Sequence, residues 1–217
     1  MQKSEIIEAL NKAKAESPKR KFKQSVDLVI NLTGVDLKKS EHQIDNFVQL
    51  HYSPGKKMRV CALVGPEMKE QAESGVDKAV LADEFDNYAK DKKITKKLAS
   101  EYDYFIGQAN IMPKIATAFG RVLGSRGKMP NPKAGLIVPP NANLKQLCEK
   151  LQKTIRIRAK TAPTVQALVG KEDMPDEELA DNAMMIYTSV IGLTPNGEHS
   201  IKSVFLKLTM GKPVRVR

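Results

Sequence analysis

Apolar side chains near the two ends of the chain recur with the periods of helices and half-buried strands. Residues 4–15 predict an amphipathic helix with Ser4 as its N-cap. Residues 25–32 alternate between apolar and polar positions, which predicts a strand with one buried face. Residues 175–191 predict a long helix with an acidic first turn, and residues 201–208 predict another strand. Both ends therefore combine half-buried strands with amphipathic helices.

The middle of the chain follows a different pattern. Residues 60–64 are continuously apolar, which is typical of a strand buried on both faces of a parallel sheet. Further short strands are predicted at residues 79–81 and 102–106, and helical segments separate them, one of which is expected to have Asp83 as its N-cap. This alternation of strands and helices favours a small Rossmann-like α/β unit.

The change of pattern predicts two domains. Residues 1–65 and 155–217 are each too short for a substantial core, and together they reach a normal domain size. We therefore expect them to form one discontinuous α+β domain, with residues 66–154 inserted as a Rossmann-like three-layer α/β domain. The fold class is α/β. No apolar run approaches the ~20 residues of a membrane helix, so no membrane partner is expected.

Charge supplies the first functional indication. The chain of 217 residues has 36 Lys and Arg against 25 Asp and Glu, a net charge of +11 at pH 7. The excess is spread over all three segments, which favours a polyanionic partner without identifying it. The lysine cluster at residues 92–97 is interpreted as the solvated side of a helix that buries Ile94 and Leu98.

Residue types that would indicate metal or cofactor chemistry lack the required spacing. The three histidines have no partner at metal-ligand spacing, and no Cys-x-x-Cys occurs. Cys61 and Cys148 lie in apolar settings that predict buried thiols. The strand at residues 60–64 is not followed by a glycine-rich dinucleotide fingerprint. We expect no catalytic residue, metal or cofactor and no enzyme activity; an enzyme using the Rossmann-like domain stays as the alternative.

A loop at residues 124–135 concentrates glycine, proline and cations. Its two prolines favour an ordered loop that presents Arg126, Lys128 and Lys133 together, and its glycines would let phosphates approach the backbone. We expect these three residues to form a secondary RNA contact. An ordinary interdomain hinge is the alternative.

This loop also carries a family resemblance. Its segment Gly-Lys-Met-Pro-Asn-Pro at residues 127–132 resembles the signature of the ribosomal protein L-one family, the stalk protein of the large subunit. Residues 203–211 resemble the family's terminal strand and Thr-Met-Gly turn, residues 21–27 its first RNA-facing strand, and residues 178–182 its last long helix. The resemblance runs in order from about residue 4 to the end, and the length is closer to archaeal members.

The resemblance implies a function and its partners. Family members bind stalk ribosomal RNA through a split first domain, help to release exit-site tRNA, and repress translation of their own mRNA at an operator that mimics the ribosomal site. A cytoplasmic, ribosome-bound protein that is a monomer when free is implied. A regulator acting only off the ribosome would share the same RNA surface. By position, the RNA-binding residues would be Phe22, Ser25, Asp27, Ser203, Lys207, Thr209, Met210 and Gly211.

These residue types suit RNA recognition. Hydroxyls and a carboxylate can bind 2′-hydroxyls and base edges, and apolar side chains can pack on riboses or bases. Two alternatives stay open: Phe22 packs in the core, and Asp27 forms an ion pair with a lysine. The chain departs from the common family pattern at Ser125 and at Lys212, where many relatives have proline. Both departures bear on the shape of a loop.

Overall fold

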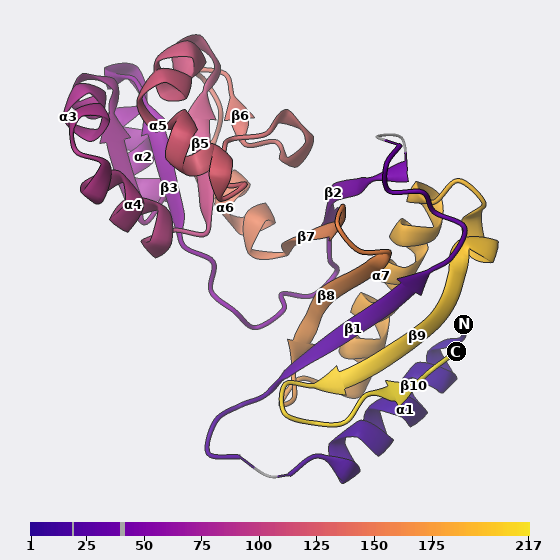
Figure 1. Cartoon of the computed structure of the whole chain (residues 1–217). Coiled ribbons are helices and arrows are strands. Elements are labelled where there is room, and N and C mark those ends of the chain that lie inside the picture. The colour runs from indigo at the N-terminus through magenta and orange to yellow at the C-terminus, as the bar shows by residue number, and fades with distance from the viewer. Residues whose placement is uncertain (19, 40–41) are drawn as a thin grey trace. The chain divides into compact units, whose positions relative to one another are not determined.

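The computed structural model describes residues 1–18, 20–39 and 42–217, and the chain forms two compact units (Figure 1). Unit 1 is made from both chain ends, Met1–Lys56 and Lys153–Arg217, and unit 2 is the intervening segment Lys57–Gln152. The expected first boundary at residue 65 is wrong, because the strand before it pairs within the sheet of unit 2. The expected second boundary, after residue 154, lies two residues too late.

Unit 1 contains a four-stranded sheet, a two-stranded ribbon and two long helices. The sheet has the order β10-β9-β1-β8, and the ribbon pairs β2 with β7. Its elements in chain order are α1 (Lys3–Glu16), β1 (Ser25–Leu32), β2 (Ile44–Gln49), β7 (Thr154–Ala159), β8 (Thr164–Lys171), α7 (Asp176–Leu193), η6 (Gly197–Ser200), β9 (Ile201–Leu208) and β10 (Val214–Arg215). All pairings in unit 1 are antiparallel.

The central strand β1 shows how the sequence pattern produces this sheet. Its buried side chains are Val26, Leu28, Ile30 and Leu32, as the alternation predicts. They pack with side chains of α1 and α7 in one core, so the helices cover this face of the sheet. The intervening side chains of β1 are partly exposed on the opposite face, called the open face below. The predicted bounds of β1 and β9 are confirmed.

The two helices begin with charges that favour helix formation. The backbone N–H of Gln2 donates to the Glu5 carboxylate at 2.7 Å, so the helix α1 begins earlier than the expected cap at Ser4. Helix α7 has Asp176, Glu177 and Glu178 in its first turn, where the helix dipole favours acids. No described helix is long and apolar enough to cross a membrane.

Unit 2 is a three-layer α/β domain. Its four-stranded sheet has the order β4-β3-β5-β6, and its strand pairs are parallel. Its elements are β3 (Val60–Val64), η2 (Pro66–Met68), α2 (Lys69–Gly75), β4 (Lys78–Leu81), η3 (Ala82–Glu84), α3 (Phe85–Lys90), α4 (Lys92–Glu101), β5 (Tyr104–Gln108), η4 (Ala109–Ile111), α5 (Met112–Ser125), η5 (Pro132–Ala134), β6 (Ile137–Val138) and α6 (Leu144–Gln152). One core joins the sheet to α3, α4 and α5, and a second joins it to α2 and α6.

Two local predictions in unit 2 are wrong. Asp83 caps no long helix; the cap is Asp91, whose carboxylate accepts the Lys93 N–H at 2.8 Å at the start of α4. Ile94 is 49% exposed, and α4 buries Thr95, Leu98 and Ala99. The Thr95 hydroxyl can be buried because it donates to the Tyr88 carbonyl at 2.7 Å.

Candidate nucleic-acid interface

The open face of the unit 1 sheet brings together predicted RNA-binding residues from both chain ends. Asp27 on β1 pairs with Lys207 on β9, and Asn31 pairs with Ser203. Paired residues of an antiparallel sheet project from the same face. The open face therefore holds Asp27, Ser203 and Lys207 side by side on adjacent strands, although the two strands are almost 180 positions apart along the chain.

The turn that follows β9 is fastened to the start of β1. The Ser25 N–H donates to Thr209 Oγ1 at 3.0 Å, and the Thr209 hydroxyl lies 3.3 Å from the Ser25 carbonyl, which also accepts the Thr209 N–H at 3.0 Å. The Ser25 hydroxyl accepts from the Lys171 ammonium at 2.9 Å. The Thr209 hydroxyl is thus committed to the protein backbone, and its role in the turn is to hold the two segments together.

Gly211 completes this turn at close quarters. Its N–H donates to the Leu208 carbonyl at 3.0 Å. A Cβ at this position would lie 3.2 Å from the Leu208 Cβ and 3.3 Å from the Ser17 hydroxyl oxygen, which is tighter than ordinary side-chain contacts. The absence of a side chain therefore lets the turn lie against the segment that follows α1.

Phe22 and Met210 are large apolar residues with unusually exposed side chains. Phe22 is 51% exposed and Met210 is 54% exposed. The alternative that Phe22 packs in the core is therefore wrong. Apolar side chains at the rim of a polar face are suited to pack on a ribose or a base.

Asp27 is the acidic member of the open face. Partial burial raises the pKa of its carboxyl above the ordinary range, while Lys207 and Lys171 oppose that rise. No ion pair within 4 Å joins Asp27 to a residue that the structure describes. The ion-pair alternative is not supported, and the carboxylate has free acceptor capacity.

Sequence reasoning missed three polar residues around this face. The Asn31 amide donates to the Ser203 hydroxyl at 3.0 Å, and Thr164 on β8 lies 3.2 Å from the Asn31 oxygen. A polar row therefore crosses three strands. Asn31 was identifiable from the alternation of β1, whereas the positions of Thr164 and Lys171 depend on the pairing of β8 with β1, including a register irregularity at Val26 and Asp27.

The glycine-rich loop of unit 2 does not present its three cations together. The Lys128 ammonium donates to the carbonyls of Ala99 at 3.0 Å and Tyr102 at 2.6 Å, at the end of α4. Arg126 donates to the Ser100 hydroxyl at 2.6 Å, and Lys133 is exposed. The expected joint presentation is therefore wrong for Lys128, because the last carbonyls of a helix attract a cation.

The sheet of unit 2 offers a second place to look for a site. In parallel α/β sheets ligands bind at the carboxyl ends of the strands, where the strand order reverses, here between β3 and β5. The buried Gln108 side chain accepts the Gly65 N–H there at 2.8 Å. A backbone donor that could face a phosphate is therefore already bonded to this amide.

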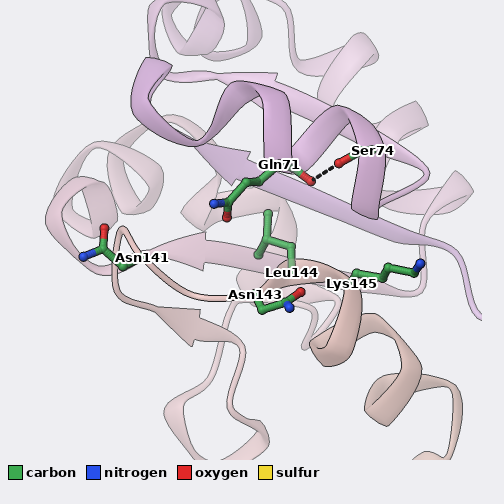
Figure 2. A pocket seen from close by; sticks show the side chains of 6 residues that line it. All are labelled: Gln71, Ser74, Asn141, Asn143, Leu144 and Lys145. Atoms are coloured by element: carbon green, nitrogen blue, oxygen red, sulfur yellow. Dashed lines mark hydrogen bonds between the residues drawn. The ribbon is translucent and has the colours of Figure 1, made fainter.

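A polar hollow in unit 2 lies between α2 and the start of α6 (Figure 2). It measures about 340 Å³ and is lined by Gln71, Ser74, Asn141, Asn143, Leu144 and Lys145. The Ser74 hydroxyl donates to a backbone carbonyl of its own helix.

Burial raises the pKa of Cys61 to about 12 and that of Cys148 to about 11, so neither thiol is a thiolate at neutral pH.

Comparison with known proteins identifies the family of this chain. The model of the Ribosomal protein L1p/L10e family matches residues 11–212. The large ribosomal subunit protein uL1 of Nanoarchaeum equitans is 42% identical over 97% of this chain and 98% of its own length. The uL1 proteins of Methanothermococcus thermolithotrophicus and Hyperthermus butylicus are 39% and 36% identical, over 100% and 98% of this chain and 99% and 95% of their own lengths. The chain belongs to the L1 family of ribosomal proteins and is of its archaeal type.

Proposed function

We propose that this protein is a structural constituent of the large ribosomal subunit and binds stalk ribosomal RNA through unit 1. The observation that carries the proposal is the joining of two distant segments, residues 22–27 and 203–211, into one polar surface with exposed apolar groups at its rim. Membership of the L1 family supports it.

The chemistry of the surface suits RNA more than a general polyanion. A purely electrostatic site would consist of cations, whereas this face combines Asp27 with Ser203, Asn31 and Lys207. A half-buried carboxylate repels phosphates, but it accepts strongly from 2′-hydroxyls and base amino groups. The net charge of +11 would attract RNA to the protein, and the uncharged and acidic groups would select among RNA structures.

The finer parts of the proposal follow from the family. The protein would act in the cytoplasm as part of the mobile stalk, assist release of exit-site tRNA, and repress its own mRNA through the same open face. Free protein would be a monomer. Of the proposed secondary contact, Arg126 and Lys133 keep exposed positions, while Lys128 supports the packing of unit 2.

The alternative, an enzyme that uses unit 2, has weaker support. The carboxyl ends of β3 and β5 hold a hydrogen-bonded Gln108 side chain where a dinucleotide would need free backbone donors. A thermal-shift screen with nucleotides tests this alternative directly. A clear stabilisation by one nucleotide would favour it.

The experiment for the RNA proposal is a titration of the full chain with a stalk rRNA fragment at several salt concentrations. Sub-micromolar binding that depends on the RNA structure and weakens with salt is expected, because bound phosphates release counterions. Equal affinity for an unrelated duplex would refute the proposal. Co-sedimentation with large ribosomal subunits then separates a ribosomal constituent from a regulator that acts only off the ribosome.

A further inference from the structure

The exposed side chains of the proposed RNA surface raise a question of positioning. Phe22 and Met210 are each more than half exposed, so packing of their own side chains does not fix where they lie. Fixed placement matters because free side chains lose conformational entropy when they bind. Their backbone segments must therefore be held by other groups.

One buried amide connects both segments. Gln24 is 2% exposed, and its Oε1 accepts the Met210 N–H at 3.0 Å across 186 positions of sequence. Its Nε2 lies 3.1 Å from the Ser17 hydroxyl and 3.3 Å from the Pro18 carbonyl. Its own backbone carbonyl accepts the Glu172 N–H at 3.0 Å. A single residue thus ties the segment after α1, the segment after β8 and the turn after β9 to one another.

We propose that Gln24 is the positioning residue of the RNA surface. It sets the position of Met210 relative to Phe22, which lies two residues before Gln24 in the chain. Gln24 is buried and does not itself touch RNA. This inference rests on the proposed RNA function. An amide is suited to this task because it offers an acceptor to the turn and donors to the other segment at once, without a charge to desolvate.

The surroundings of the amide show what its loss would leave unpaired. A hollow of about 360 Å³ lies beside it, and Ser17, Gln24 and Leu208 are among the residues that line it. The Met210 N–H has no other hydrogen bond in the described part of the chain. Loss of the Gln24 oxygen therefore leaves the Met210 N–H without its partner, whereas the bonds between Thr209 and the Ser25 backbone and the antiparallel pairing of β1 with β9 persist.

The test is a double-mutant cycle with the full chain and a stalk rRNA fragment. Gln24→Met keeps the side-chain length and removes all three hydrogen bonds of the side chain, while the bond to its backbone carbonyl stays. We expect it to weaken RNA binding about tenfold, the size of one lost hydrogen bond. In a Met210→Ala background the same change should cost less than about twofold, because Gln24 acts through Met210. Losses that multiply would overturn the inference.

A matched control separates positioning from general stability. Gln152 in unit 2 makes a similar pair of amide bonds, to the Met58 N–H at 2.9 Å and to the Met58 carbonyl at 2.7 Å. Gln152→Met should destabilise the protein to a similar extent and leave RNA affinity unchanged. An equal loss of affinity in both variants would assign the effect to stability and overturn the inference.

Two further measurements keep this inference distinct from the RNA proposal. Hydrogen exchange of the Met210 amide in the free protein should accelerate in Gln24→Met, and unchanged exchange would overturn the inference without reference to RNA. If exchange accelerates but Met210→Ala binds RNA normally, the proposed RNA surface fails, and with it the positioning role.

A glutamate in place of Gln24 tests the role of the amide by protonation. In Gln24→Glu the neutral acid can replace both the donor and the acceptor, but the buried carboxylate cannot donate. The affinity of this variant relative to the natural protein should recover as the pH falls and the carboxyl takes up a proton. Burial and the nearby Glu172 raise the pKa of such a carboxyl, whereas Lys14 and Arg20, which line the same hollow, lower it. A ratio that does not change with pH would contradict the role assigned to the amide.

Discussion

Replacing Asp27 with asparagine tests whether the acid on the open face recognises RNA. The change keeps the shape of the side chain and removes its charge. Lys207 lies opposite on β9 and Lys171 lies nearby, so the site is more positive after the change. If Asp27 only repels phosphates, the variant binds RNA more tightly. If its carboxylate accepts hydrogen bonds from RNA, the variant binds more weakly.

The magnitude of each effect follows from the environment of Asp27. A hydrogen bond to a charged acceptor contributes about 1.5–3 kcal/mol, so we expect affinity to fall about 10- to 100-fold. The free energy of unfolding of the variant should rise by about 0.5 kcal/mol, the usual size for a substitution outside the core. Burial raises the pKa of Asp27, so the ionised carboxylate costs the folded state stability at neutral pH.

The sign of that stability change can be checked with pH. The gain in Asp27→Asn should be present at neutral pH and disappear as the pH falls through the raised folded pKa toward the ordinary carboxyl pKa of about 3.9. Urea unfolding measures it. RNA affinity is measured beside Glu8→Gln, which removes the same charge from an exposed position of α1. Tighter or unchanged RNA binding by Asp27→Asn would refute the reasoning.

Four further substitutions test the RNA surface and the charged contacts that stabilise the fold. Thr209→Ala removes the hydroxyl bonded to the Ser25 backbone and should weaken specific RNA binding by about 1–3 kcal/mol, whereas Lys93→Ala on exposed α4 should do little; equal effects in a binding titration would contradict the proposed site. Lys128→Met should destabilise unit 2 by about 1–3 kcal/mol in urea and leave RNA affinity nearly unchanged, because its ammonium bonds two carbonyls; a large affinity loss at unchanged stability would return Lys128 to the RNA surface. Asp45→Asn removes a bidentate bond that Arg156 donates and that holds the pKa of Asp45 well below its usual range. It should cost about 1 kcal/mol above pH ~4, and the difference from the natural protein should shrink in acid as that protein loses the same stabilisation. A pH-independent difference would rule out this origin.

Predictions from the sequence were most accurate where one local period dominates. The alternation over residues 25–32 and 201–208 defined both strands and their buried faces, because side chains of a strand alternate strictly between the two sides. The buried stripe of α7 also follows from its helical spacing. The predicted burial of Ile94 was wrong, because the few apolar side chains of a short helix do not determine which of its sides packs on the sheet.

The candidate site shows the same division. The family resemblance named Ser25, Asp27 and Lys207, and the strand alternation placed Ser25 and Asp27 on the polar side of their strand. Neither predicts that the Thr209 hydroxyl is used up on the Ser25 backbone. Likewise, the sequence of the basic loop in unit 2 predicted a cluster of cations. Only the packing of α4 beside the loop shows that the Lys128 ammonium binds the carbonyls at the end of that helix.

By itself, the sequence determined the alternating strands, the amphipathic helices, the two-domain pattern and a basic charge that suits RNA. The tertiary structure decided which of these segments meet. Gln24 and Met210 are 186 positions apart, and no local pattern relates them. Their contact exists because β1 pairs with β9 in one register, and register depends on the packing of whole buried faces. For this reason the role of Gln24 as the positioning residue of the proposed RNA surface could be inferred only from the folded chain.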